Sequence, residues 1–185
     1  TLLTNGLESR GNTSRELRVR WNITRALLLT LEGKEGLKTN SSEFFSTRNF
    51  RIRYYETAPV FSIQPGTTFR LSFGYRYAQK QNAADIGNER LFLNRASVEV
   101  KYNVLSKGSF NAEFAYISMN YSGSPSSAVA WDMLEALKPG ENYTWRVNWQ
   151  RALANNLQLT LGYEGRKSPN SKTIHTGSAQ VRAMF

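Results

Sequence analysis

Apolar and polar residues alternate with a period of two along much of this 185-residue chain. The clearest case is the segment 143–149, in which aromatic or apolar residues occupy every second position and polar residues the others. Successive side chains of a β-strand point to opposite faces, so the alternation is typical of a strand with one apolar face. The pattern predicts nine strands, at residues 17–23, 27–37, 50–54, 69–77, 96–104, 110–116, 143–149, 157–163 and 177–185.

The links between these segments alternate in length. Long links at 38–48, 79–90, 121–141 and 166–171 are separated by short turns at 24–25, 106–108 and 154–156, and only the link 57–66 departs from this rule. Outer-membrane barrels have short periplasmic turns and longer extracellular loops. The sequence therefore predicts an all-β fold, an antiparallel transmembrane β-barrel in the bacterial outer membrane, with the C-terminus on the periplasmic side.

Composition is compatible with this fold but does not identify it. The chain is 40% apolar with a mean hydropathy of −0.50 and has no apolar run of eighteen residues, which excludes transmembrane helices. A barrel strand presents only every second residue to lipid, so its hydropathy signal is weak. The absence of cysteine excludes disulfides and thiolate metal sites.

The aromatic residues of the apolar faces fall near the two ends of the predicted strands. One group comprises Trp21, Phe69, Tyr102, Phe110, Trp149 and Phe185, and the other Tyr75, Tyr77, Tyr116, Tyr143, Trp145 and Tyr163. Aromatic rings favour the interface between water and lipid, so these groups indicate two aromatic girdles. The alternative is a soluble β-sandwich or lipocalin-like barrel that encloses the aromatic face in its core.

The strand count predicts that the chain is a single segment of a larger barrel, spanning residues 1–185. Nine is an odd number, whereas single-chain bacterial barrels have an even number of strands. Residues 1–4 offer the tail of a tenth strand, and the chain begins without a signal peptide. We expect the remaining strands upstream in the same polypeptide or in another chain. A closed ten-stranded barrel is the alternative.

The net charge of +10 and the pI near 10 would ordinarily indicate nucleic-acid binding. Many basic residues, however, fall on the polar faces of strands, which line the lumen of a barrel and are closed to duplex nucleic acid. These residues are Arg18, Arg20, Arg51, Arg53, Arg70, Arg76, Arg95, Lys101, Arg146 and Arg182.

Two interpretations of this charged face stay open. The acidic residues Glu16, Glu32, Glu99, Glu113 and Glu164 share the face, which indicates ion pairs that brace the wall. A lumen that admits anionic cargo or holds an acidic plug is the functional alternative. The predicted loop residues Lys80, Lys138, Arg166, Lys167 and Lys172 are candidates for contact with lipopolysaccharide phosphates, whereas Lys107 lies in a predicted periplasmic turn.

The loop 122–141, predicted to be extracellular, contains a short helix pattern. Ser126 or Ser127 is a candidate N-cap, and Pro139 with Gly140 would end the helix. Trp131, Leu134 and Leu137 are spaced about one turn apart and predict an apolar stripe. The stripe fits either a lid across the barrel mouth or a docking helix for a surface partner.

The residues offer little for catalysis, so we expect no enzyme and no cofactor. The single histidine, His175, has only two aspartates in the chain to pair with, and both lie in predicted loops. An outer-membrane hydrolase would need a serine beside His175 on the lipid face, but Ser178 falls on the opposite face.

The last third of the chain resembles a known family. The order of residues in 132–145, 157–167, 174–177 and 181–185 is similar to the C-terminus of large outer-membrane barrel proteins of Bacteroidota, a group that includes the SprA/Sov type IX secretion translocon. The resemblance implies that Phe185 is an assembly signal read by the barrel-assembly machinery. It also implies partners in the bilayer, in lipopolysaccharide and among other envelope subunits.

The function predicted from these observations is that of a structural or transport component of the cell envelope. A soluble β-barrel that binds lipid or carbohydrate is the first alternative, and the outer-membrane hydrolase is the second. Fold alone does not identify an activity, because terminal strands close a barrel whatever its pore does.

Overall fold

The computed structural model describes residues 2–3, 6–83, 87–105, 107–154 and 156–183. Within them lie one short 3-10 helix, η1 (Ser46–Arg48), and one α-helix, α1 (Ala128–Met133). The strands are β1 (Leu2–Leu3), β2 (Gly6–Asn22), β3 (Leu27–Ser42), β4 (Phe50–Ile63), β5 (Phe69–Asn82), β6 (Arg90–Val104), β7 (Gly108–Ser122), β8 (Gly140–Ala154), β9 (Leu157–Lys167) and β10 (Ile174–Ala183).

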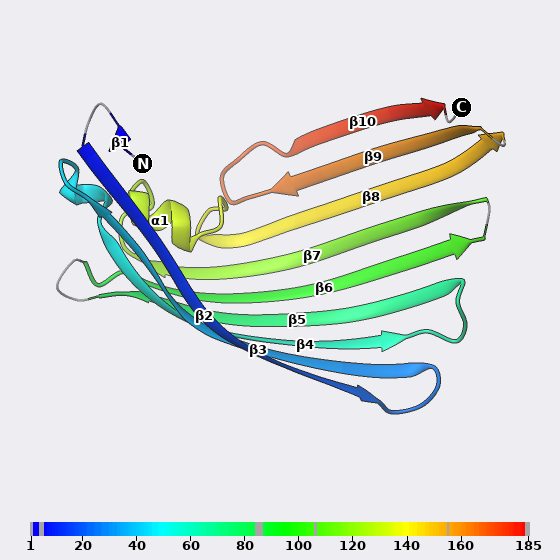
Figure 1. The fold of residues 1–185 in the computed structure, drawn as a ribbon, viewed down its shortest axis with the longest axis horizontal. Helices are drawn as coiled ribbons and strands as arrows, with labels where there is room; N and C mark the ends of the chain where they lie inside the picture. Colours follow the sequence, from blue (N-terminus) through cyan, green and yellow to red (C-terminus); the bar gives the residue numbers. More distant parts are fainter. Residues whose placement is uncertain (1, 4–5, 84–86, 106, 155, 184–185) are drawn as a thin grey trace.

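The strands form one antiparallel sheet in chain order, from β1 to β10. The sheet is strongly curved, and α1 lies on its concave side (Figure 1). Among the described residues, β10 pairs only with β9, and β2 pairs with β3 and briefly with β1, so the sheet is open. The all-β antiparallel prediction is confirmed.

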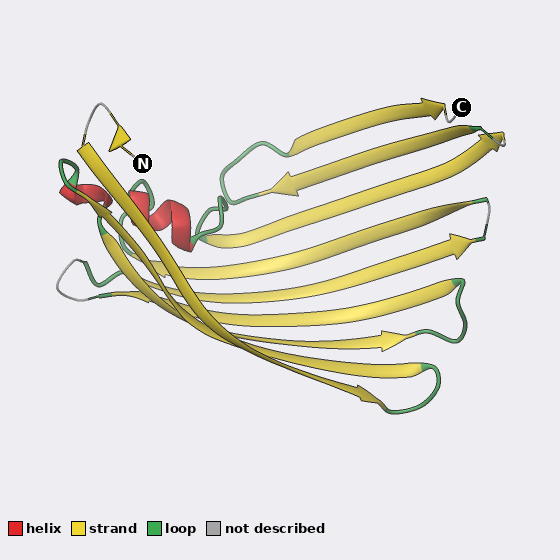
Figure 2. Ribbon diagram, viewed as in Figure 1, coloured by secondary structure: helices red, strands yellow, loops and turns green. Residues whose placement is uncertain are grey.

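Short and long connections gather at opposite ends of the sheet. Residues 23–26, 64–68, 105–107 and 155–156 join strands at one end, where β10 also finishes, and residues 43–49, 83–89, 123–139 and 168–173 join them at the other. Both helices lie at the end with the long connections (Figure 2). The predicted long link 57–66 is wrong because β4 continues to Ile63, and the alternation of lengths therefore has no exception between β2 and β10.

Most strands are longer than the pattern predicts. β2, for example, begins at Gly6 rather than at Leu17. Its first half is polar on both faces, so hydrophobic alternation is absent there, yet its backbone pairs continuously with β3 from Glu8 to Asn22. Backbone hydrogen bonding extends strands beyond the region where side-chain polarity reveals them.

The register divides the side chains between two faces. We call the face on which α1 packs the inner face and the other the outer face. A compact apolar cluster lies on the inner face beneath α1 and comprises Ile52, Ala78, Leu91, Leu93, Ala115, Ile117, Met119, Val129, Ala130, Met133 and Leu134. Much of the remaining apolar surface lies on the outer face and is exposed.

Two glycines accommodate aromatic rings that cross onto a neighbouring strand. The ring of Trp145 in β8 occupies the space that a side chain at Gly165 of β9 would fill. The ring of Tyr54 covers Gly36 in the same way, and its hydroxyl donates to Oδ1 of Asn12 at 3.3 Å. A ring laid over a glycine protects the backbone and fixes the pairing of the two strands.

We expect Gly165→Ala to destabilise the folded sheet by about 1–3 kcal/mol, because the new methyl group displaces the Trp145 ring. Thermal unfolding in detergent measures the effect. Gly33→Ala is the matched control, since a Cβ there meets no atom within 4 Å. Equal stability of the two variants would show that the ring does not depend on the glycine.

Candidate functional site

Most of the basic residues predicted to face a lumen share the inner face. The register and the contacts place Arg18, Arg20, Arg70, Arg76, Arg95, Lys101, Arg146 and Arg182 there. The acidic residues predicted beside them, Glu16, Glu32, Glu99, Glu113 and Glu164, lie on the same face. The inner face is therefore strongly charged outside the cluster beneath α1.

The prediction is wrong for Arg51 and Arg53, which lie on the outer face. Arg53 is directly opposite Leu37 of β3 and Gln81 of β5, whereas Ile52 and Tyr54 are buried on the inner face. Apolar residues face inward at this end of β4 because α1 and its cluster provide an apolar environment there. Further along β4, Phe61 faces outward, so the apolar face changes sides within the strand.

Ion pairs connect neighbouring strands across the inner face. Arg18 of β2 bonds to Glu32 of β3 at 2.9 Å, and Arg146 of β8 bonds to Glu164 of β9 at 2.7 Å. Arg95 of β6 pairs with Glu113 of β7 in the same manner. These are the cross-strand pairs that the sequence predicts, and partly exposed pairs of this kind contribute about 0–1 kcal/mol each.

The connection 123–139, which we call the plug, packs on the inner face. Ser127 caps α1, and its Oγ accepts a hydrogen bond from the backbone N–H of Ala130 at 3.0 Å. Val129, Ala130 and Met133 are buried against the sheet. The helix therefore packs on the sheet, whereas a lid across a barrel mouth stays a prediction.

The helix is shorter than predicted, and its apolar stripe differs. α1 ends at Met133 with Leu134 as its C-cap, so Pro139 and Gly140 do not end it. Glu135 and Ala136 turn the chain away with φ values of 55° and 61°, in the left-handed region. Trp131, predicted in the stripe, is 73% exposed.

Charge as well as apolar packing anchors the plug. Arg76 of β5 donates two hydrogen bonds to the Glu135 carboxylate, at 2.8 and 3.0 Å. Lys80, also of β5, is buried and donates from Nζ to Glu135 at 2.8 Å and to the carbonyl of Met133 at 3.0 Å. Asp132 accepts a bond from Lys38 of β3 at 3.0 Å. The plug is thus the acidic partner of a basic wall.

The environment of Glu135 favours its ionised form. Burial opposes ionisation of the carboxyl, but the hydrogen bonds from Arg76 and the charge of Lys80 outweigh it and lower the pKa of Glu135 to about 2. The carboxylate therefore stays charged at every physiological pH, and together with Glu56 of β4, which also pairs with Arg76 at 2.9 Å, it balances the charges of the two basic residues.

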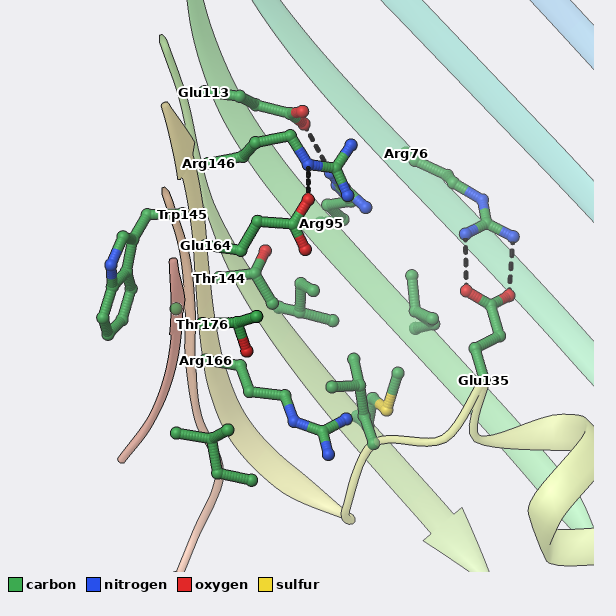
Figure 3. Close-up of a pocket in the computed structure, with 16 residues that line it drawn as sticks. Arg76, Arg95, Glu113, Glu135, Thr144, Trp145, Arg146, Glu164, Arg166 and Thr176 are labelled. Atoms are coloured by element: carbon green, nitrogen blue, oxygen red, sulfur yellow. Dashed lines mark hydrogen bonds and ion pairs between the residues drawn. The ribbon is translucent and has the colours of Figure 1, made fainter. Parts of the chain in front are cut away.

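A cavity of about 510 Å³ lies between the plug and the inner face of β5–β10 (Figure 3). Its charged lining consists of Arg76, Arg95, Glu113, Glu135, Arg146, Glu164 and Arg166. Leu93, Ile117, Met119 and Leu137 provide an apolar part of the wall. Figure 3 shows Trp145 projecting from the other side of the sheet, away from the charged side chains.

Arg166 gives this cavity a free positive charge. In the part of the chain that the structure describes, Arg166 has no ion-pair partner, and it lines the cavity beside Thr144 and Thr176. A guanidinium with two nearby hydroxyl-bearing residues suits a carboxylate or phosphate group. The free charge and the two hydroxyl groups therefore make this part of the cavity chemically suited to an anionic group.

Those of the predicted aromatic residues that the structure describes all lie on the outer face. Within 6–183, cross-strand neighbours form a row from Phe69 through Tyr102 and Phe110 to Trp149 near the short turns. A second group, with Tyr75, Tyr77, Tyr116, Tyr143, Trp145 and Tyr163, lies nearer the long connections, and Trp21 extends the aromatic surface to β2. Phe185, the predicted assembly signal, lies outside the described residues.

His175 has an aromatic environment on the outer face. Its ring stacks on Tyr163, whose hydroxyl is 2.8 Å from Nδ1, and lies beside Trp145. Ser178 is on the inner face, opposite Gly162, as the sequence predicts. The described residues contain no cluster of three or more His, Cys, Asp or Glu side chains suited to a metal ion.

The sequence analysis missed the roles of Lys80 and Glu135 in holding the plug and of Arg166 in lining the cavity. It assigned Lys80 and Arg166 to loops, although both lie in strands and face inward. It also gave Glu135 no partner. The face of Lys80 could have been predicted from that of Arg76, because residues four apart in a strand share a face.

No protein-family model matches the chain, and a search of curated proteins finds no significant match. Among the described residues, no helix is long and apolar enough to cross a membrane.

We expect Glu135→Gln to loosen the plug by about 1–3 kcal/mol, because it leaves the buried Lys80 without a carboxylate. Hydrogen exchange in residues 128–134 measures the opening. The matched control is Glu164→Gln, which breaks an exposed pair with Arg146 and should change stability by about 0–1 kcal/mol. Equal exchange in both variants would contradict an electrostatic anchor.

The pH dependence of the plug follows from the lowered pKa of Glu135. A carboxyl whose pKa falls from 4.5 to about 2 on folding contributes stability that is complete above pH 4.5 and is lost as pH falls through 2. Exchange in residues 128–134, corrected for the intrinsic rate, should be constant from pH 7 to 5 and rise below about 3. Opening between pH 7 and 5 would exclude Glu135 as the titrating group.

Proposed function

We propose that this chain forms part of an outer-membrane β-barrel and serves as a structural or transport component of the cell envelope. In this proposal the outer face contacts lipid, the inner face lines a lumen, and the plug narrows the lumen at its extracellular mouth. The charged cavity beside the plug then lies on the route of any solute that passes.

The observation that carries the proposal is the distribution of side chains on the sheet, whose exposed outer face is apolar and whose inner face is charged. Outer-face residues such as Trp21 (61% exposed), Val181 (61%) and Phe114 (49%) leave a broad apolar surface uncovered. The inner face, which would be the core of a soluble barrel, carries arginine–glutamate pairs instead. Soluble monomers rarely expose apolar surface on this scale.

The dimensions of the apolar surface support the same conclusion. The outer residues of β5 between Phe69 and Tyr77 are all aromatic or aliphatic. At the usual rise this span is about 26 Å along the strand. A barrel tilt of about 40° reduces its height to about 20 Å, near the apolar band of about 25 Å in outer-membrane barrels.

The open edges of the sheet favour a barrel that contains further strands. Along the described part of β10, one edge has no strand partner, and most of β2 is likewise open on one side. Unpaired backbone groups cost several kcal/mol each in hydrocarbon. We therefore propose that strands from the same polypeptide or from another envelope subunit complete the wall, with Phe185 as the signal for the assembly machinery.

A pair of adjacent arginine substitutions tests the membrane proposal. Val98 lies on the outer face in the row between Phe73 and Phe114, four residues along β6 from Tyr102 of the aromatic row near the short turns, and Ser97 faces inward. Val98→Arg should destabilise the inserted protein by about 2–4 kcal/mol, whereas Ser97→Arg should change it little. Folding into lipid vesicles, followed by denaturant titration, measures both.

Two outcomes would contradict the proposal. Equal tolerance at the two positions would mean that lipid does not contact the outer face. Folding of the unaltered chain in water, with no incorporation into vesicles, would favour a soluble barrel.

A further inference from the structure

A group of basic residues lies on the outer face near the long connections. It includes the two arginines that sequence reasoning assigned to the lumen. We call Arg15, Arg51, Arg53 and Arg90 the outer basic patch. Arg53 of β4, Gln81 of β5 and Arg90 of β6 are direct cross-strand neighbours, and Arg51 lies two residues from Arg53 on the same face. At the usual strand spacing, Arg53 and Arg90 are about 10 Å apart at the backbone.

Apolar surface continues up to this patch. Tyr55 (48% exposed), Leu37 and Phe92 (each 37%) lie on the outer face next to the arginines. A hollow of about 230 Å³ lies among Arg15, Leu37, Arg53 and Tyr55, with the carboxylate residue Glu35 also in its lining. The sheet thus presents an apolar track that ends at positive charge and has a tyrosine at the boundary, where amphipathic rings are favoured.

The charges of the patch are available to a ligand. Within the described residues, Arg51, Arg53 and Arg90 form no ion pair, and Arg15 forms a long one with Glu35 at 3.9 Å while its side chain stays 89% exposed. The inner-face arginines Arg76, Arg95 and Arg146, by contrast, are paired with glutamates.

The patch does not continue onto β7 and β8, and basic charge reappears on the outer face near this end only with Lys167 of β9 among the described strand residues. Asn120 and Ser122 of β7 occupy the rows of Phe92 and Arg90, and β8 presents Glu141 on the outer face near the same end. Solubility alone does not explain why the outer face is basic on β4 and β6 but neutral or acidic on β7 and β8.

We propose that the outer basic patch binds the phosphate groups of a membrane lipid, whose acyl chains lie along the apolar track below. This inference rests on the proposed function, because the lipid reaches the patch only if the outer face contacts a bilayer. Guanidinium groups bind phosphate through two parallel hydrogen bonds, and arginines on neighbouring strands can contact two phosphates of one headgroup. The extracellular end of the barrel is therefore matched to a lipid with more than one phosphate.

Binding of lipid A, a diphosphorylated lipid, tests the inference. The chain is reconstituted in phosphatidylcholine nanodiscs with increasing fractions of lipid A, and retained lipid is counted by native mass spectrometry. The double variant Arg51→Gln with Arg53→Gln should weaken lipid A binding roughly tenfold, since each charge near the surface attracts anionic lipid. Arg51→Lys with Arg53→Lys should weaken binding less than the glutamine pair, because the charges remain while the paired hydrogen bonds of the guanidinium groups are lost.

The matched control is Arg20→Gln with Arg182→Gln, which removes two charges from the inner face. This control should leave lipid A binding unchanged. Equal loss in both double variants, or no loss in the outer one, would overturn the inference. Competition by inorganic phosphate at the same concentration as lipid A would identify a general anion site and would also overturn it.

Failure of this inference is distinguishable from failure of the proposed function. Insertion into nanodiscs without preference for lipid A rejects the lipid site and leaves the barrel proposal intact. Absence of insertion by the unaltered chain rejects both.

Discussion

The strand register is the constraint on which the rest of the structure depends. Because side chains alternate along each strand, the register decides which residues of neighbouring strands meet on a face, and a slip of one residue would exchange the two faces. In this sheet the register aligns Phe73, Val98 and Phe114 on the outer face and Arg76 with Arg95 on the inner. One geometrical choice therefore creates both the apolar wall and the charged interior.

The plug depends on a local exception to that division. Near the long connections the inner face becomes apolar at Ile52, Leu91 and Ile117, and α1 packs there. Lys80 lies at the border of this cluster and is buried, so its charge needs the carboxylate of Glu135. Apolar packing brings the plug to the wall, and the ion pairs fix its position against β5.

The two faces use charge in different ways. On the inner face, Arg18, Arg76 and Arg146 meet glutamates on adjacent strands or on the plug, so their charges are largely neutralised, whereas Arg166 has no ion-pair partner among the described residues. On the outer face, the basic residues Arg51 and Arg53 lie above apolar side chains and form no ion pair within the described residues, although Glu35 lines the same hollow as Arg53. The first arrangement braces a wall, and the second leaves charge for a partner.

The amino-acid sequence by itself determined the presence and order of the main strands and the ends at which long and short connections lie, and it limited the cap of α1 to Ser126 or Ser127, because these features depend on periodicity and on local hydrogen bonding. It did not determine the face of Arg51 and Arg53 or the burial of Lys80. At this end of the sheet the inner face of β4 is apolar and its outer face carries the arginines. This arrangement depends on α1, which is distant in sequence and packs on the inner face. Tertiary structure decided these positions, since an alternating pattern shows that a strand has two faces but not which neighbour will cover each one.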